Sequence, residues 1–176
     1  MLPRFAAILC TLAIPSLPFC ADDLPDPDVV EKAIRKASDF YISRLATHGG
    51  YASSWKAGLG RTEHREGKEL ISIQPPGTTT IGLAMLRAYE ATGDAAFLAG
   101  AQGAARALLD CQLESGGWTD DFDFGGDDAQ RHFLRKHALA GDTERGRRDN
   151  SSTLDDDKTQ SATLFLLELA HTPASR

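Results

Sequence analysis

The sequence predicts an all-α fold, an incomplete α/α toroid of stacked helical hairpins with long loops on one side. Apolar residues recur at the period of a helix in four segments, and no alternating strand pattern competes with them. Two helical segments end in the same kind of corner, Gly49-Gly50-Tyr51 and Gly116-Gly117-Trp118. Repeated helix pairs with such corners are typical of toroids that stack hairpins into a ring.

The first helix is expected after the Pro-rich entry "DLPDPDVV". Asp26 or Asp28 is suited to cap it, because a carboxylate oxygen can accept a hydrogen bond from a free amide of the first turn. Its apolar positions recur at helical spacing: Val30, Ile34, Ala37, Tyr41 and Leu45. The glycines of the following corner are expected to end this helix.

The second helix is expected near Thr78, because the Pro75-Pro76 pair just before it cannot lie inside a helix. Its apolar side carries Ile81, Met85, Ala88 and Tyr89. The segment 92–94 breaks the pattern, and Asp94 is a good cap for a third helix that runs to about Gln112. Two helices joined by so short a turn form an αα-hairpin.

Residues 119–152 show no sustained periodicity, so we expect a long loop with at most a short helix near residues 129–139. The first part of this loop is acidic and the second part is basic. The last helix is predicted from about Asp156 to Ala170.

Residues 1–21 are predicted to be a signal peptide, because one early cation, Arg4, precedes an apolar run and then acidic residues. The apolar run contains Pro15 and Pro18 and is too short for a membrane span. We therefore expect a secreted or periplasmic protein with no membrane contact after signal removal, whose single domain comprises residues 22–176.

Composition narrows the class of protein. A hydrophobic fraction of 41% suits one soluble domain, and a net charge of -6 argues against nucleic acid as a partner. Cys111 is the one cysteine expected in the mature chain, which excludes a disulfide framework. It lies at an apolar helical position and is expected to be a small buried side chain.

The sequence matches neither of two common metal-binding patterns, the EF-hand calcium loop and the spacing of zinc ligands. The acidic loop that begins at Asp121 has the EF-hand glycine at its sixth position, but Gly125 and His132 stand at its fifth and twelfth positions, where acidic or amide ligands are needed. We expect this loop to be solvated. The five histidines also lack zinc spacing.

The triplet Asp155-Asp156-Asp157 runs directly into the last apolar helix. Acids at a helix start interact favourably with the helix dipole, but one acid suffices for a cap. Three adjacent carboxylates repel one another, so they need exposure, basic neighbours or a bound cation. Asp155 and Asp157 are candidate metal ligands, with neutral oxygens available from Asn150, Thr153 and Thr159. A charged helix start and a cation site both remain open from the residues alone.

Four segments together resemble the pectate lyases of polysaccharide lyase family 10: "HGGYASSW", "REGKELISIQPPGTTTIGLAMLRAYEATGD", "LLDCQLESGGW" and "NSSTLDDDKTQSATLFLLELA". They resemble in particular a bacterial branch with signatures of the type "QPPGTPTVG" and "TLDDDTTQSA". The resemblance covers most of residues 30–170. It implies an α/α toroid that cleaves polygalacturonate by β-elimination with calcium. In that mechanism calcium bridges protein and substrate carboxylates, an arginine removes the C5 proton, and the glycosidic oxygen leaves from C4.

The resemblance implies that Asp155, and second Asp157, bind calcium or substrate. Arg147 and Arg148, together with Asn150, are candidate uronate-binding residues, and solvated loop charges are the alternative for the two arginines. The catalytic arginine of the family lies in later helical repeats. No base is therefore assigned, and the domain is expected to be truncated.

Two hypotheses of function follow. The first is an exported pectate lyase-like protein acting on polygalacturonate or a related acidic polysaccharide, either active or, as a truncated form, inactive. The second is a non-catalytic carbohydrate-binding or interaction module on an α/α scaffold. Tyr51, Trp55 and Trp118 would then stack on sugar rings, and core packing is their alternative. A glycoside hydrolase would need two facing carboxylates, which the sequence does not place.

Overall fold

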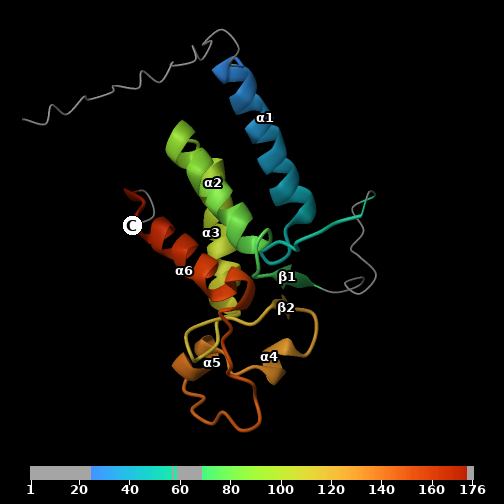
Figure 1. Ribbon diagram of the computed structural model, residues 1–176, viewed down its shortest axis with the longest axis vertical. Helices are drawn as coiled ribbons and strands as arrows, with labels where there is room; N and C mark the ends of the chain where they lie inside the picture. The colour runs from blue at the N-terminus through green and yellow to red at the C-terminus, as the bar shows by residue number, and fades with distance from the viewer. Residues whose placement is uncertain (1–24, 57, 59–68, 174–176) are drawn as a thin grey trace, which may run out of the picture.

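The computed structural model describes residues 25–56, 58 and 69–173 (Figure 1). It is mostly helical, as the all-α prediction requires. Its elements are the helices α1 (Pro27–Phe40), α2 (Thr78–Thr92), α3 (Ala95–Asp110), α4 (Asp128–Arg131), α5 (Arg135–Leu139) and α6 (Lys158–His171), and the strands β1 (Leu70–Ser72) and β2 (Asp121–Asp123). The signal peptide predicted for residues 1–21 lies outside the described residues.

Helix α1 begins where the sequence placed its cap. The Asp26 carboxylate accepts a hydrogen bond of 2.9 Å from the amide of Asp28, and Pro27 takes the first helical position, where its missing N–H is not needed. The expectation that the glycines of the corner end this helix is wrong: a π-helical turn, Tyr41–Leu45, follows α1, and Ala46 is already extended before the glycine corner. There the amide and carbonyl groups of Thr47 and Gly50 bond reciprocally at 2.9 and 2.8 Å.

The break between α2 and α3 also lies where it was predicted. Gly93 caps the end of α2 with a φ of 72°, a left-handed conformation that glycine adopts without steric cost. The Asp94 carboxylate then accepts a hydrogen bond of 3.0 Å from the amide of Ala96 and caps α3. Local capping chemistry therefore sets both boundaries.

The expectation that the chain forms no strand is wrong for two short segments. β1 and β2 pair antiparallel, with Ile71 opposite Phe122 at the centre of the pair. Each strand has three residues, which is too short to show an alternating pattern in the sequence. The pairing joins distant segments, so only the tertiary structure brings the two strands together.

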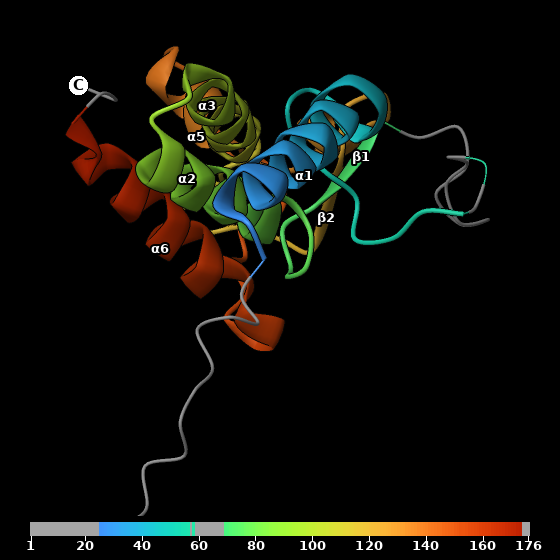
Figure 2. The same cartoon turned by 90° about the horizontal axis from the view of Figure 1, so that it is seen from above.

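The core lies where α2, α3 and α6 pack side by side, with α1 beside α2 and the short helices α4 and α5 at one end (Figures 1 and 2). Gly82 allows α2 and α6 to approach closely. A Cβ atom on Gly82 would lie 2.5 Å from the ring of Phe165 on α6 and 3.0 Å from the Cβ of Ala104 on α3. The absence of a side chain at this crossing therefore sets the spacing of the three helices.

Hydrogen bonds connect the first glycine corner to the start of the helix that follows it, α2. The amide of Tyr51 donates to the Thr78 hydroxyl at 3.0 Å, and the carbonyl of Tyr51 accepts from the amide of Ser72 at 2.9 Å. Ser72 lies six residues before Thr78, which begins α2.

The second corner repeats this pattern. The amide of Trp118 donates to the Thr159 hydroxyl at 3.3 Å, and the carbonyl of Trp118 accepts from the amide of Thr153 at 3.1 Å. Thr153 again lies six residues before the threonine, which is in the first turn of α6. The similarity of the two corners in the sequence is therefore a repeated local structure.

Candidate functional site

The aspartate triplet does not start the last helix. Residues Asp155–Asp157 form a separate 3-10 turn, and α6 begins at Lys158, two residues later than predicted. Asp156 and Asp157 have positive φ angles of 50° and 59°, a left-handed conformation that aspartate tolerates better than most residues. Asp157 precedes the helix without a capping hydrogen bond from its side chain. The predicted start of the helix at Asp156 is therefore corrected by two residues, and the three acids lie directly before the N-terminal end of α6.

The chain supplies its own cation to this turn. The side chain of Lys158 is 7% exposed, and its ammonium nitrogen lies 3.5 Å from a carboxylate oxygen of Asp120 and 3.6 Å from one of Asp156. The burial of Lys158 was not predicted, although its position in the sequence indicates it. Lysine 158 stands four and seven residues before Ala162 and Phe165, on the same buried face of α6.

The side chains of Asp155 and Asp157 remain exposed in the same turn. Carboxylate oxygens are the hard ligands that calcium prefers, but calcium takes roughly six to eight oxygens. In residues 25–56, 58 and 69–173 no group of three or more His, Cys, Asp or Glu side chains is arranged to hold a metal. The two carboxylates therefore fit calcium in chemical type, and a ligand and water would have to supply most of its coordination.

The neutral oxygens expected nearby are already engaged in holding the turn and the corner. The Thr153 hydroxyl accepts a hydrogen bond of 3.1 Å from the amide of Asp155, and the Thr159 hydroxyl accepts one from Trp118. The Asn150 side chain accepts from the amide of Ser115 at 2.8 Å and donates to Glu114 at 3.0 Å. These contacts place Asn150 against the second glycine corner.

The two candidate arginines differ in their surroundings. The Arg148 guanidinium bonds to both oxygens of Asp142 at 2.6 and 3.0 Å and lies 4.7 Å from the ring centre of Phe133. The hydrogen bond from Arg148 holds the pKa of Asp142 below its ordinary value. Arg147 is exposed, and no contact of its side chain is recorded with another described residue.

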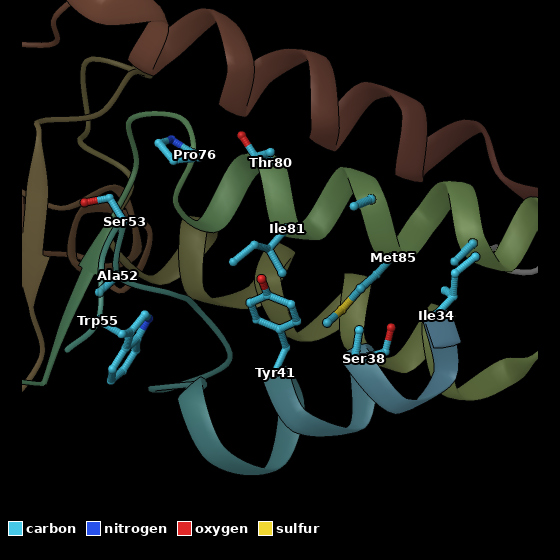
Figure 3. A pocket seen from close by; sticks show the side chains of 13 residues that line it. Ile34, Ser38, Tyr41, Ala52, Ser53, Trp55, Pro76, Thr80, Ile81 and Met85 are labelled. Carbon is cyan, nitrogen blue, oxygen red and sulfur yellow. The ribbon is translucent and has the colours of Figure 1, made fainter. Parts of the chain in front are cut away.

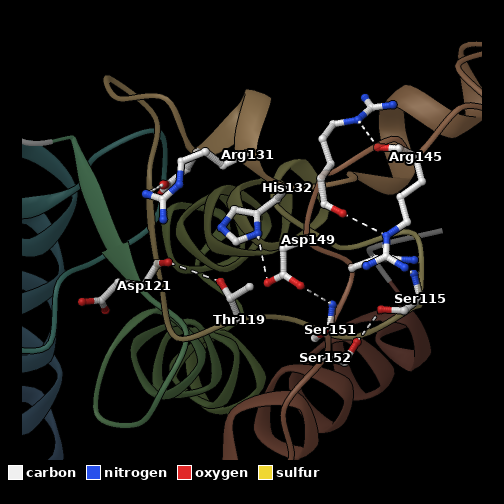
Figure 4. Close-up of polar contacts among 12 residues, drawn as sticks. Ser115, Thr119, Asp121, Arg131, His132, Arg145, Asp149, Ser151 and Ser152 are labelled. Atoms are coloured by element: carbon white, nitrogen blue, oxygen red, sulfur yellow. Dashed lines mark hydrogen bonds and ion pairs between the residues drawn. The ribbon is translucent and has the colours of Figure 1, made fainter.

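Arg147 and Arg148 line a polar cleft with a volume of about 470 Å³, whose other lining residues are Gln130, Arg131, His132 and Asp149. The imidazole of His132 is directed toward the Asp149 carboxylate, with 3.7 Å between Nδ1 and Oδ2 (Figure 4). The amide of Ser151 donates to Asp149, and this hydrogen bond lowers the pKa of the carboxyl. Sequence reasoning missed Arg131, His132 and Asp149, because their proximity depends on the pairing of two loop segments.

The aromatic residues proposed for sugar stacking separate into two groups. Tyr51 and Trp118 are 1% and 2% exposed, so core packing is confirmed for them and stacking on a sugar is excluded. The Trp118 indole nitrogen donates to the carbonyl of Leu108 at 2.8 Å, which satisfies its polar atom inside the core. Trp55 is half-buried and lines an apolar groove of about 440 Å³ between α1 and α2 (Figure 3).

Two carboxylates of the acidic loop after residue 120 form hydrogen bonds with backbone amides. The Asp123 carboxylate accepts from the amides of Glu69 and Gly125 at 3.0 and 3.1 Å, and the Asp128 carboxylate accepts from the amide of Asp123 at 2.8 Å. These carboxylates stabilise the loop backbone, so the expectation of a merely solvated loop is wrong for Asp123 and Asp128. Their hydrogen bonds satisfy amides that the short strands leave free.

Cys111 is buried, as expected from its position at the end of α3. Burial and the neighbouring Asp110 carboxylate raise the pKa of its thiol far above the ordinary value. The thiolate needed for a nucleophile is therefore disfavoured, which supports a packing role for Cys111.

Comparisons of the chain with protein families, with curated proteins and with solved structures found no match. Across the described residues, no helix is both long enough and apolar enough to cross a membrane.

Proposed function

We propose that the chain is an exported pectate lyase-like protein that binds polygalacturonate, or a related acidic polysaccharide, with calcium and acts on it by β-elimination. The observation that carries the proposal is the acidic turn before α6. Asp155 and Asp157 keep exposed carboxylates there, and the helix does not use them as caps. One oxygen of Asp155 accepts a hydrogen bond of 3.1 Å from the amide of Asp156, and exposed carboxylates of this kind keep further lone pairs that suit a cation and an acidic ligand.

Each residue of the turn has a distinct role in this proposal. Asp155 and Asp157 would hold calcium, which when bound neutralises the uronate carboxylate and makes the C5 proton more acidic. Lys158 holds Asp156 at 3.6 Å and so keeps the turn in place. We assign the base to no residue of this chain.

We further propose that the helices form part of an α/α toroid. The repeated hydrogen bonds from the two glycine corners to Thr78 and Thr159 support it, because they relate two successive helix pairs by the same local geometry. The helices that these corners precede, α2 and α6, also contact each other, with 3.2 Å between the hydroxyls of Ser161 and Thr79.

A second candidate function is a non-catalytic carbohydrate-binding module on the same scaffold. Among the described residues, Lys158 is the cationic side chain that contacts the aspartate turn, and its ammonium is buried and paired with two carboxylates. A paired ammonium is poorly suited to remove a proton from a substrate. This favours binding without catalysis at the turn.

Two measurements on the full chain test both functions. Purified protein is incubated with polygalacturonate and calcium while the absorbance of unsaturated products is followed, and calcium-dependent binding is measured in parallel. Product formation supports the lyase, and binding without product supports the module. Asp155→Asn and Asp157→Asn should each weaken the calcium-dependent signal, while Asp39→Asn on α1 should leave it unchanged. A folded protein that neither binds nor cleaves would contradict both proposals.

A further inference from the structure

The polar cleft between residues 130–132 and 147–149 has a fixed backbone. The amide of Asp149 donates to the carbonyl of Arg131 at 2.8 Å, and the amide of Phe133 donates to the carbonyl of Asp149 at 2.7 Å. These two bonds form a parallel bridge with His132 opposite Asp149. The side chains of the two segments are therefore held in one register, as a binding site requires.

One wall of the cleft is immobilised by Arg148. Its guanidinium donates to Asp142, to the carbonyl of Glu144 and, through Nε, to the carbonyl of Arg145. It also lies over the ring of Phe133, which adds a cation–π contact. The charge of Arg148 is neutralised by Asp142, so this residue shapes the cleft without offering a free charge.

The other two arginines of the cleft, Arg131 and Arg147, differ in how far their charge is balanced. The Arg131 guanidinium donates a long hydrogen bond of 3.4 Å to Asp128 and lies 3.7 Å from Asp127, so its charge is partly balanced. Arg147 is exposed and has no recorded counter-ion among the described residues. A guanidinium recognises a carboxylate through two parallel hydrogen bonds, so Arg147 is the group best placed to receive one.

The cleft also contains groups that suit hydroxyls. The Asp149 side chain is 49% exposed, and its Oδ2 faces His132 at 3.7 Å, beyond hydrogen-bond distance. Nδ1 of His132 is buried and has no hydrogen-bond partner. The exposed amide of Gln130 adds a donor and an acceptor at the rim.

We propose that this cleft is a subsite for one uronate residue of an acidic polysaccharide. Arg147 receives the uronate carboxylate, assisted by Arg131, while Asp149 and Gln130 bond to the sugar hydroxyls. The volume of about 470 Å³ lies within the range of roughly 300–1,000 Å³ common for small-molecule sites. This subsite rests on the proposed function and extends it to residues outside the acidic turn.

The Asp149 carboxylate distinguishes a uronate from a phosphate or sulfate. A carboxylate beside the ligand repels a compact dianion but accepts hydrogen bonds from hydroxyls. A uronate carries one negative charge at one end and hydroxyls at the other. The combination of Arg147 and Asp149 on one segment matches that arrangement of charge and hydroxyls.

Isothermal titration of the full chain with trigalacturonate, with calcium present, tests the subsite. Arg147→Ala should weaken binding about tenfold, because one charge-assisted hydrogen-bonding group is lost. Arg135→Ala is the matched control, since Arg135 is exposed on α5 and does not line the cleft. Both variants should retain the melting temperature of the unchanged protein. Trigalacturonate methyl ester should bind the unchanged protein and Arg147→Ala equally, because it lacks the carboxylates.

The outcomes separate the subsite from the proposed function. If trigalacturonate binds and Arg147→Ala is indistinguishable from Arg135→Ala, the subsite is overturned while the proposed function stands. Equal weakening of trigalacturonate and its methyl ester by Arg147→Ala also overturns the subsite, since the arginine would then not recognise a carboxylate. If the folded protein binds no trigalacturonate with or without calcium, the proposed function fails, and the uronate subsite fails with it.

Discussion

The buried ammonium of Lys158 lies 3.5 Å from the carboxylate of Asp120. This contact joins the first residue of α6 to the segment that follows the second glycine corner. The same ammonium lies 3.6 Å from Asp156, so one cation from the chain neutralises carboxylates from two segments. The acidic turn is thus partly balanced by the protein itself, and we expect this pairing to affect stability and the affinity of the proposed calcium site.

Lys158→Met should lower the free energy of unfolding by about 1 kcal/mol at low salt. Methionine keeps the buried aliphatic contacts, so the loss is electrostatic. The carboxylates of Asp120 and Asp156 are 67% and 56% exposed and can be rehydrated, which limits the cost. Urea unfolding at two salt concentrations measures it. The control is Lys136→Met, which removes an exposed lysine 3.7 Å from Asp110 and should lower the free energy of unfolding by less. If the effect of Lys158→Met does not shrink as the salt concentration rises, the electrostatic cause is contradicted.

The same Lys158→Met variant should bind calcium more tightly. Removing a positive charge beside the turn lowers the repulsion of the cation by about 1 kcal/mol, or roughly fivefold in affinity. Calcium titration followed by calorimetry or by the melting temperature measures the change. In the double variant Asp155→Asn/Lys158→Met, the increase in calcium affinity should be lost. Equal calcium affinity in the variant and the unchanged protein would show that Lys158 does not influence the turn.

Gly82→Ala and Gly103→Ala should change stability in opposite directions. A methyl group at Gly82 would meet Phe165 at 2.5 Å, and such overpacking costs about 1–3 kcal/mol. At Gly103 on α3 the nearest atom would be the Cα of Gly49 at 3.8 Å, so alanine fits and should stabilise the helix by about 0.5–1 kcal/mol. In thermal and urea unfolding, Gly82→Ala should therefore be less stable than the unchanged protein and Gly103→Ala more stable. Destabilisation by both, to a similar extent, would contradict the packing at the α2–α6 crossing.

Thr78→Val should destabilise the first glycine corner by about 1–3 kcal/mol. The fully buried Thr78 hydroxyl accepts from the amide of Tyr51 at 3.0 Å and donates to its carbonyl at 3.2 Å, and valine leaves both groups without that partner. Thr163→Val on the exposed face of α6 is the control, because its hydroxyl bonds only to the carbonyl of Thr159. The two variants are compared by urea unfolding. Equal stability would mean that the corner does not depend on its threonine.

The Asp142–Arg148 pair should make the free energy of unfolding depend on pH in the acidic range. The pKa of Asp142 is lowered in the folded chain from an ordinary value of 3.8, so its contribution is fully present above that value and is lost as pH falls through the lowered pKa. Asp142→Asn should therefore lower the urea midpoint at neutral pH, and the difference from the unchanged protein should shrink below about pH 4. A difference that stays constant into acid would contradict the lowered pKa.

Much of the helical structure could be read from local chemistry. Asp26, Asp94 and Gly93 mark helix ends through capping and left-handed backbone, and these effects act within a few residues. The acidic turn was recognised from its three adjacent carboxylates, but its conformation was not. Left-handed backbone at Asp156 and Asp157 has no signature in a stretch that also resembles a charged helix start.

The sequence by itself determined the positions of the long helices, the two glycine corners and the carboxylates of the candidate site. The tertiary structure alone decided which distant residues meet: Lys158 with Asp120, Arg131 and His132 with Asp149, and β1 with β2. Helix periodicity and capping depend on neighbours along the chain, so one sequence reveals them. Contacts between distant segments depend on how helices and loops pack. The same packing buries Tyr51 and Trp118 in the core and places Arg147 in the lining of an open cleft.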